Sequence, residues 1–392
     1  MLLGVKRVAR IAHLSDLHYE ESEPGLRSQV ENILHGAKPD FVVVTGDLVE
    51  TNKPRELGYA KDWLDSLVAK LTPRPRLIVI PGNHDLKPWG TLGVPLQSRR
   101  SACAPFLDTF RGDDRTTPIK KGVEVLAGGP GAEICFIGVW SAQKTSILAT
   151  GNVTSDQLQE LDTVLAGDEA KRALFRIVLV HHHPLPTRYK PKGYVQQYSN
   201  SLMAFHNAGQ FLESMVRHEC DLVLHGHRHF AGHAQYSLET GGHGVSVISA
   251  GTATRRDSDD QRGNHLNLID LFYDGTARME SRFFSDSHPR EDATREFELI
   301  RLVDVARKRN VLAAQACHYR AAAVRKWVTV GQNGYSDIVV QFQSCGALDV
   351  GEGNVPEMPI KLSSGTPTCA RGTHLTSATS SSFRRPALVS TW

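Results

Sequence analysis

The chain has 392 residues, of which 40% are hydrophobic and 22% charged, a composition that is typical of a globular protein and excludes disorder of the whole chain. Its 45 Lys and Arg residues against 42 Asp and Glu give a formal net charge of +3, too weak to indicate a nucleic-acid-binding surface. No apolar run approaches the roughly 18 residues of a membrane helix and no cleavable apolar segment follows Met1, which predicts a cytoplasmic protein without a membrane partner.

Short apolar runs rich in Val and Ile recur along the chain, and their length and composition predict buried strands rather than helices. In chain order these predicted strands are 8–14, 41–45, 77–80, 134–139, 177–180, 222–224 and 245–249. Between several of them, apolar residues at three- and four-residue spacing predict amphipathic helices. These helices are 28–34 with its continuation, 57–71, 155–165 with Ser155 as the N-cap, and 201–217.

Two further runs, 266–272 and 277–284, flank Asp274-Gly275, a pair that favours a hairpin turn and a change to antiparallel strands. The order strand, helix, strand in the preceding sequence is typical of an α/β domain. Together these elements predict one mixed α/β domain over residues 7–285.

The sequence after this domain predicts an extension of helix and strand over 286–350. Apolar residues on one face of 289–327 predict a single long helix, and 328–343 predicts one or two strands. The apolar face of that helix must be buried against the first domain or a second subunit, which leaves homo-oligomerisation open. The region 351–392 has little periodicity, and its part after residue 363 is rich in Ser and Thr and has no acidic residue, which predicts a disordered tail.

Polar segments follow several of the predicted strands at the point where each strand ends. They are Asp16-Leu17-His18, Gly46-Asp47, Gly82-Asn83-His84-Asp85, His181-His182-His183-Pro184 and Gly226-His227-Arg228-His229. Because the carboxyl ends of strands in an α/β sheet open into one crevice, we expect these segments to converge. Their oxygen and imidazole groups, with no thiolate, suit Mn, Fe, Zn or Co rather than a structural zinc site. The pattern therefore predicts a transition-metal centre.

The same residues fit a centre that holds two metal ions. Two cations about 3.5–4 Å apart need a shared carboxylate, and Asp47 is the natural candidate for this bridge. On an extended segment, alternate side chains lie on one face, which would pair Asp16 with His18 and His227 with His229. Each pair would then reach the same centre.

This series of motifs resembles that of the calcineurin-like metallophosphoesterases, and the resemblance extends over residues 7–285. Leu185-Pro186 and the compact body are most similar to their bacterial cyclic-nucleotide phosphodiesterase branch. The resemblance implies a four-layer α/β/β/α sandwich. It also implies one metal held by Asp16, His18, Asp47 and His229, and another held by Asp47, Asn83, His227 and one histidine of the triple run. The family ligand usually lies two residues before the proline, which selects His182 and leaves His181 and His183 as alternatives.

The resemblance implies a phosphodiesterase that needs two divalent or trivalent transition metal ions. Attack of a metal-bridging hydroxide would hydrolyse a small, cyclic-nucleotide-like phosphodiester. His84 would act as the general acid or stabilise charge in the transition state, with Asp85 orienting its imidazole. The segment 188–207 is a candidate substrate rim, with Arg188, His206 and Asn207 as candidate contacts, although it also fits an ordinary polar loop and helix cap. The loop 87–100 is a candidate for the opposite wall.

Other activities fit the same motifs. They are a nuclease, a phosphomonoesterase acting on proteins or nucleotides, a sugar-lipid pyrophosphatase, and a non-catalytic metal-binding scaffold for interactions. A nuclease would show a basic groove with aromatic residues, which a net charge of +3 does not favour. A scaffold would need a broken motif, and each motif here is complete. We therefore expect an enzyme for a small phosphodiester, without nucleic acid as a partner.

Overall fold

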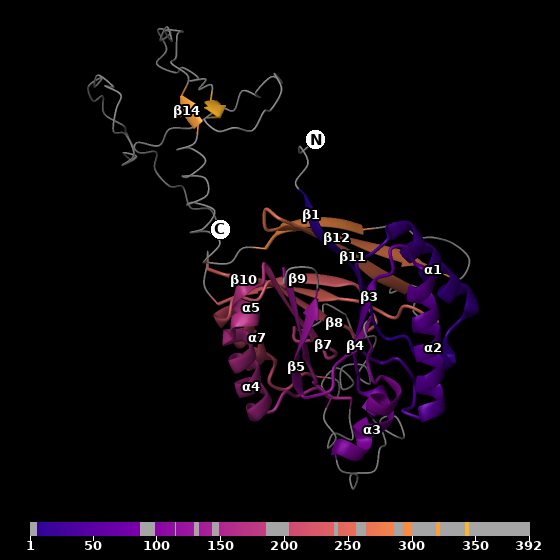
Figure 1. Cartoon of the computed structure of the whole chain (residues 1–392). Coiled ribbons are helices and arrows are strands. Elements are labelled where there is room, and N and C mark those ends of the chain that lie inside the picture. Colours follow the sequence, from indigo (N-terminus) through magenta and orange to yellow (C-terminus); the bar gives the residue numbers. More distant parts are fainter. Residues whose placement is uncertain are drawn as a thin grey trace, which may run out of the picture. The chain divides into compact units, whose positions relative to one another are not determined.

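The computed structural model describes residues 6–86, 99–113, 115–128, 133–142, 149–185, 204–238, 242–255, 264–285, 293–299, 319–321 and 342–344 (Figure 1). The chain divides into two compact units, Met1–Arg307 and Lys308–Trp392. In the second unit, the described residues form one antiparallel pair of short strands, β14 (Tyr319–Ala321) and β15 (Phe342–Ser344).

Two β-sheets form the body of the first unit. The seven-stranded sheet has the order β13 (Ala293–Glu298), β12 (Thr276–Phe284), β11 (Asn264–Phe272), β1 (Arg7–Leu14), β2 (Phe41–Thr45), β3 (Arg76–Ile80) and β4 (Thr116–Pro118). The six-stranded sheet has the order β5 (Val123–Gly128), β6 (Ile134–Val139), β7 (Phe175–Val180), β8 (Leu222–His225), β10 (Gly244–Ser249) and β9 (Gly232–Ser237). In each sheet the neighbouring central strands, β1 to β3 and β6 to β8 with β10, are parallel.

Helices cover the outer face of each sheet. The helices α1 (Pro24–Ala37) and α2 (Pro54–Lys70) lie on the seven-stranded sheet, with α3 (Arg99–Thr109) beside α2 (Figure 1). On the six-stranded sheet lie α4 (Ser155–Ala166), α5 (Asp168–Arg172) and α7 (Ala208–Arg217). Two short 3₁₀ turns, η1 (Tyr19–Glu21) and η2 (His84–Leu86), follow β1 and β3. These layers confirm the predicted α/β/β/α sandwich.

The central strands are rich in apolar residues because most positions on both of their faces are buried. In β6, Phe136 packs against Phe41 of the other sheet, with ring centroids 5.1 Å apart. Ile137, the next residue, belongs instead to the apolar cluster beneath α4 and α7. The same alternation holds in β7, where Ile177 faces the other sheet and Val178 faces the helices. Short runs of Val and Ile are therefore the expected pattern for these strands.

The hairpin predicted at Asp274-Gly275 is confirmed. It joins β11 to β12, and Gly275 takes a φ of 81°, in the left-handed region that favours glycine. The Asp274 carboxylate accepts a hydrogen bond from the backbone N–H of Thr276 (3.0 Å). This bond closes the turn.

The predicted helix over 289–327 is wrong where the structure describes it. Residues 293–298 form β13, which pairs antiparallel with β12, and 319–321 form β14. Phe297 of β13 packs on the core and stacks on His233, with centroids 4.5 Å apart. Pairing with the edge of the sheet overrides the helical spacing, because it satisfies the backbone hydrogen-bonding groups and at the same time buries the Phe297 side chain. Of the region 328–343 with its one or two predicted strands, residues 342–343 belong to β15, and the rest lies outside the described residues, as does the predicted tail.

The predicted helix starts also differ from the observed ones, since α1 begins at Pro24 and α2 at Pro54, ahead of the predicted residues 28 and 57. Thr154, not Ser155, is the N-cap of α4, and its side chain and that of Gln157 bond each other's backbone N–H. The helix α7 begins at Ala208, while residues 204–207 are not helical and 201–203 lie outside the described part.

Candidate metal centre

The polar segments after β1, β2, β3, β7 and β8 converge, as the sequence predicts. Because β1 to β3 and β7 to β8 are parallel neighbours, their carboxyl ends lie at one edge of each sheet. Backbone hydrogen bonds join the segments. The N–H of Asp16 donates to the carbonyl oxygen of Gly46 (2.9 Å), and the N–H of Gly226 donates to the carbonyl oxygen of His181 (3.0 Å). The functional side chains are thus held by a rigid frame.

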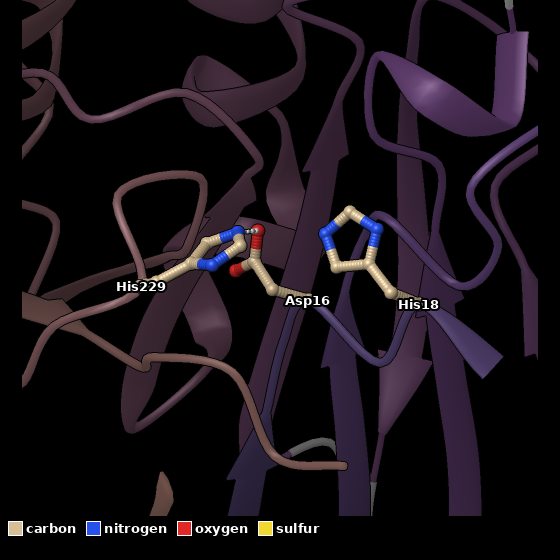
Figure 2. A group of neighbouring side chains, drawn as sticks. All are labelled: Asp16, His18 and His229. Atoms are coloured by element: carbon tan, nitrogen blue, oxygen red, sulfur yellow. Dashed lines mark ion pairs between the residues drawn. The ribbon is translucent and has the colours of Figure 1, made fainter. Parts of the chain in front are cut away.

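One group of side chains comprises Asp16, His18 and His229 (Figure 2). The Nε2 atom of His229 lies 3.2 Å from an Asp16 carboxylate oxygen. Burial would raise the pKa of Asp16, but His229 outweighs it and lowers that pKa below its usual value. The group therefore offers an ionised carboxylate and two imidazoles around one point.

A second group comprises Asp47, His181 and His227, all of them buried. The Nε2 atom of His181 lies 3.2 Å from an Asp47 carboxylate oxygen, 3.2 Å from His227 Nδ1 and 3.1 Å from the Asn83 side-chain oxygen. Burial would lower the pKa of His181, but the Asp47 carboxylate raises it to about 9. Burial would likewise raise the pKa of Asp47, yet His181 and His84 hold it well below its usual value.

These groups fit metal ions by their chemistry and by an unused ligand atom. The Nε2 atom of His18 is buried and has no hydrogen-bond partner among the described residues. A buried imidazole nitrogen without a partner costs free energy, which a bound cation would remove. Both groups present carboxylate and imidazole atoms, and the second also has the Asn83 amide oxygen beside it, a set of donors that suits transition metals.

The ligand segments are not extended, so the predicted alternation along them is wrong, although Asp16 and His18 do lie in one group as predicted. Left-handed φ values between 42° and 75° occur at Asp16, His18, Asp47, His227 and His229. Each costs about 1–2 kcal/mol in a non-glycine residue, a strain typical of functional sites. As a result His227 joins the group of Asp47, whereas His229 joins that of Asp16.

A family model for the calcineurin-like phosphoesterases matches residues 9–231. The chain belongs to the calcineurin-like phosphoesterases. These are metal-dependent hydrolases of phosphoesters with dinuclear metal centres. This assignment confirms the family that the motifs indicate.

Similar proteins agree with this family. Glycerophosphodiester phosphodiesterase GpdQ of Enterobacter lignolyticus (strain SCF1) is 35% identical over 88 residues, which cover 20% of this chain and 30% of that protein. The chain thus matches less than a third of this curated relative's length. Purple acid phosphatase PPD1 from yellow lupin (Lupinus luteus) has a TM-score of 0.51 at 15% identity, covering 73% of this chain and 53% of the other. PhoD has a TM-score of 0.52 at 10% identity, covering 76% and 70%. The two structural likenesses show the fold.

In this phosphoesterase His181, not His182, reaches the second group. The Nδ1 atom of His182 lies 2.8 Å from the Ser141 hydroxyl, and its ring packs on the His227 ring, with centroids 4.4 Å apart, outside the group of possible ligand atoms. Alternation along β7 explains this, because Ile177 and Leu179 face the other sheet and His181 continues their face. The spacing to the proline therefore gives the wrong histidine, whereas the alternation of side chains along the strand selects His181.

Asp85 does not orient the His84 ring, which corrects that prediction. Its carboxylate accepts hydrogen bonds from the backbone N–H groups of Leu48 (2.9 Å), Val49 (3.2 Å) and Gly82 (2.8 Å). Burial raises the pKa of Asp85 to about 7, and the negative charge of the nearby Asp47 contributes to this rise. Asp85 thus braces the backbone of the two ligand loops of the phosphoesterase.

Glu50, which the sequence analysis missed, contacts the His84 ring, as does the His18 ring, with centroids 5.1 Å apart. The carbonyl oxygen of Glu50 lies 2.9 Å from His84 Nδ1, and its carboxylate lies 2.8 Å from His18 Nδ1. The backbone N–H of His84 donates to Asp47 (2.9 Å). Glu50 therefore fixes the orientation of one candidate ligand and of the candidate general acid together.

The structure describes two of the three predicted substrate contacts, His206 and Asn207. Arg188 lies outside the described residues, as do most of the segment 188–207 and of the loop 87–100. His206 is exposed, and its backbone N–H donates to Gly151 (2.9 Å). The side-chain amide of Asn207 bonds the backbone N–H and C=O of Val153, so it closes a loop and is not free for substrate.

Within the described part of the chain, no helix is long and apolar enough to cross a membrane. The cytoplasmic location and the exclusion of nucleic acid stay predictions, and homo-oligomerisation stays open.

Proposed function

We propose that the chain is a phosphodiesterase that hydrolyses a small phosphodiester with the help of two transition metal ions. The observation that carries this proposal is the pair of adjacent ligand groups built on complete family motifs, with Asp47 in one of them. The partial similarity to GpdQ supports a diester rather than a monoester as the substrate.

We assign the ligands of the two ions from the two groups. Asp16, His18 and His229, with Asp47 as the bridge, would hold the first ion. Asp47, Asn83, His181 and His227 would hold the second, which replaces His182 of the predicted set by His181. Ions such as Mn, Fe, Zn or Co at these positions would activate water and neutralise charge on the phosphoryl group.

His84 supplies the proton for the leaving oxygen in this proposal. Its Nδ1 atom faces the Glu50 carbonyl oxygen, so Nε2 is the atom left for the substrate. Burial would lower the pKa of His84, but the Asp47 and Glu50 carboxylates raise it above its usual value. The two carboxylates therefore favour the protonated form of the imidazole, which is the form that a general acid requires.

Removal of metal tests the proposed function. Protein stripped with a chelator is expected to lose hydrolysis of bis-p-nitrophenyl phosphate and to regain it with Mn²⁺, because imidazole ligands suit this ion better than Mg²⁺. Hydrolysis rates are measured in parallel on cyclic nucleotides, p-nitrophenyl phosphate and single-stranded DNA. Full activity in protein that elemental analysis shows to be metal-free would contradict the proposal. A preference for p-nitrophenyl phosphate or DNA would replace the diester by a monoester or a nucleic acid.

The histidine pair 181 and 182 gives a matched test of the ligand assignment. His181→Ala is expected to lose at least one metal equivalent, because its Nε2 lies against Asp47 and His227. His182→Ala should keep both ions, although removing its packing against the His227 ring lowers affinity by up to about tenfold to a hundredfold. Elemental analysis and metal titration of the two variants decide. Greater metal loss in His182→Ala would reverse the assignment.

A further inference from the structure

The candidate metal centre opens to solvent on one side. Asp16 and His18 are fully buried, whereas the side chains of His84 and His229 are 17% and 22% exposed. Glu50 and Arg255 are more exposed still, at 32% and 34%. A substrate therefore reaches the ligands past these exposed groups, and Arg255 is the permanently charged cation among them.

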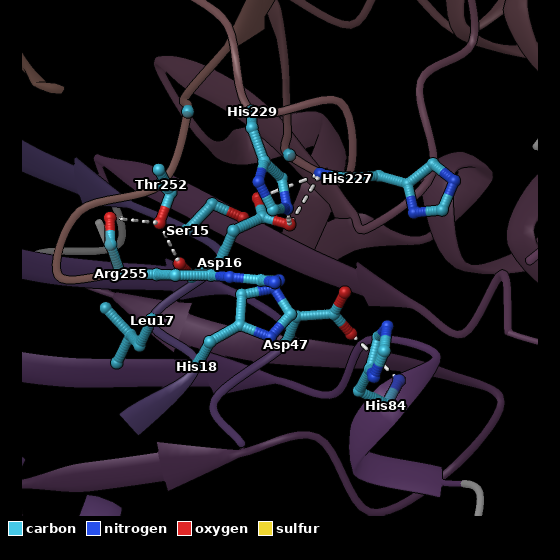
Figure 3. Close-up of polar contacts among 12 residues, drawn as sticks. Ser15, Asp16, Leu17, His18, Asp47, His84, His227, His229, Thr252 and Arg255 are labelled. Carbon is cyan, nitrogen blue, oxygen red and sulfur yellow. Dashed lines mark hydrogen bonds and ion pairs between the residues drawn. The ribbon is translucent and has the colours of Figure 1, made fainter. Parts of the chain in front are cut away.

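The loop that carries Arg255 is fixed to the ligand segment. The hydroxyl groups of Thr252 and Thr254 donate to the carbonyl oxygens of Asp16 (2.7 Å) and Leu17 (2.6 Å). The side-chain amide of Asn264 donates to the carbonyl oxygen of Arg255 (2.6 Å). In Figure 3 the Arg255 side chain runs from this loop toward the end of the site where His18 and Asp47 lie. Its position relative to the ligands is thus determined by the backbone.

Within the described part of the chain, the guanidinium of Arg255 uses only a part of its hydrogen-bonding capacity. Its Nε atom pairs with the Glu21 carboxylate (2.7 Å), which holds the side chain at the rim. One terminal nitrogen lies 3.7 Å from the Glu50 carboxylate, close enough for an ion pair but too far for a hydrogen bond. Neither terminal nitrogen has a hydrogen-bond partner among the described residues. Among the described residues, the two-pronged end of the guanidinium, which matches a pair of phosphoryl oxygens, is therefore left without a hydrogen-bond partner.

We propose that Arg255 binds the phosphoryl group of the substrate through its terminal nitrogens. This inference rests on the proposed function, because it assumes that a phosphoester occupies the centre. Glu21 anchors the Nε atom throughout, and the phosphoryl oxygens take the place of the weaker contact with Glu50. Arg255 is then a substrate-binding residue of this phosphoesterase and contributes no metal ligand.

Binding of inorganic phosphate to the metal-loaded protein tests this proposal by calorimetry. Arg255→Met keeps much of the side-chain volume and is expected to weaken phosphate binding by about tenfold to a hundredfold, the effect of losing a charged hydrogen bond. Arg255→Lys keeps the charge without the fork, so it should recover only part of the affinity. Arg278→Met is the control, because Arg278 of β12 is also exposed and pairs with a glutamate, Glu296 of β13.

Further measurements separate substrate binding from a structural role. Arg255→Met should raise KM for bis-p-nitrophenyl phosphate with unchanged metal content and melting temperature. Glu21→Gln removes the anchor but keeps the guanidinium, so its phosphate affinity should stay closer to that of the unmodified protein. Unchanged phosphate binding in Arg255→Met, or an equal loss in Glu21→Gln and Arg255→Met, would overturn the proposal. A protein that binds phosphate through Arg255 but hydrolyses no phosphoester would instead overturn the proposed function alone.

Discussion

Replacement of Asp47 by Ala is expected to lower phosphoester hydrolysis by more than about a hundredfold and to reduce the bound metal to less than one ion per chain. Loss of a residue that only supports a ligand typically costs about tenfold to a hundredfold, and loss of a shared ligand costs more. Asp47 lies against His181 of the second group, and its charge acts on Asp16 and His18 of the first, so it lies between the two candidate sites. Without it, the remaining ligands would hold two cations that face one another with no carboxylate between them.

The Asp47 variants need a control for shape and for folding. Asp47→Asn keeps the side-chain volume and an acceptor for the His84 N–H, yet lacks the negative charge, so it too should lose metal. Asp156→Ala removes an exposed carboxylate from the first turn of α4 and should keep both metals and full activity. Elemental analysis and hydrolysis rates are measured on all three proteins. Two ions per chain in folded Asp47→Ala would show that the bridge is another residue.

The sequence predicts the central strands well because their physical requirement is local. A strand that is buried on both faces needs a continuous run of apolar residues, and β2, with the sequence Phe-Val-Val-Val-Thr, meets this need in full. The convergence of the polar segments follows from the same strands, because parallel neighbours end at one edge. The layered fold and the family are therefore accessible from the sequence.

Features that depend on distant contacts are not accessible in this way. The strand β13 has helical spacing of its apolar residues, and it is a strand because β12 leaves an edge for it to pair with. Glu50 follows Asp47 in a loop, and nothing in the local pattern shows that its carboxylate turns toward His18. Arg255 is likewise one arginine among many until Thr252 and Thr254 tie its loop to the ligand segment.

The choice between His181 and His182 marks the boundary between these two cases. The period of two along β7 assigns His181 to the face that Ile177 and Leu179 share, and this signal is present in the sequence. The distance to Pro184 points to the other residue. Where a strand continues to the ligand, its period is the stronger argument, because it follows from backbone geometry.

Hydrolysis rates on two substrates with different leaving groups can distinguish a role of His84 in acid catalysis from a role in metal binding. The side chain of His84 contacts Glu50, while its contact with Asp47 is made by the backbone N–H, which a substitution preserves. His84→Ala and His84→Asn are therefore expected to keep both metals, and Asn also keeps a donor near the Glu50 carbonyl oxygen. His35→Ala, which removes an exposed histidine of α1, is the control for both variants and should leave every rate unchanged.

The loss of rate in these His84 variants should depend on the leaving group. General-acid catalysis contributes about 10²–10⁴-fold when the leaving oxygen is basic, as the ribose oxygen of a cyclic nucleotide is, and little when the leaving group is p-nitrophenolate. The rate relative to the unmodified protein should therefore fall at least about tenfold more on a 2′,3′-cyclic nucleotide than on bis-p-nitrophenyl phosphate. Equal losses on the two substrates, with both metals bound and chemistry rate-limiting, would show that His84 positions the substrate instead of protonating the leaving oxygen. Loss of metal in His84→Asn would show that the ring supports the Asn83 loop, since that loop supplies a candidate ligand of the second ion.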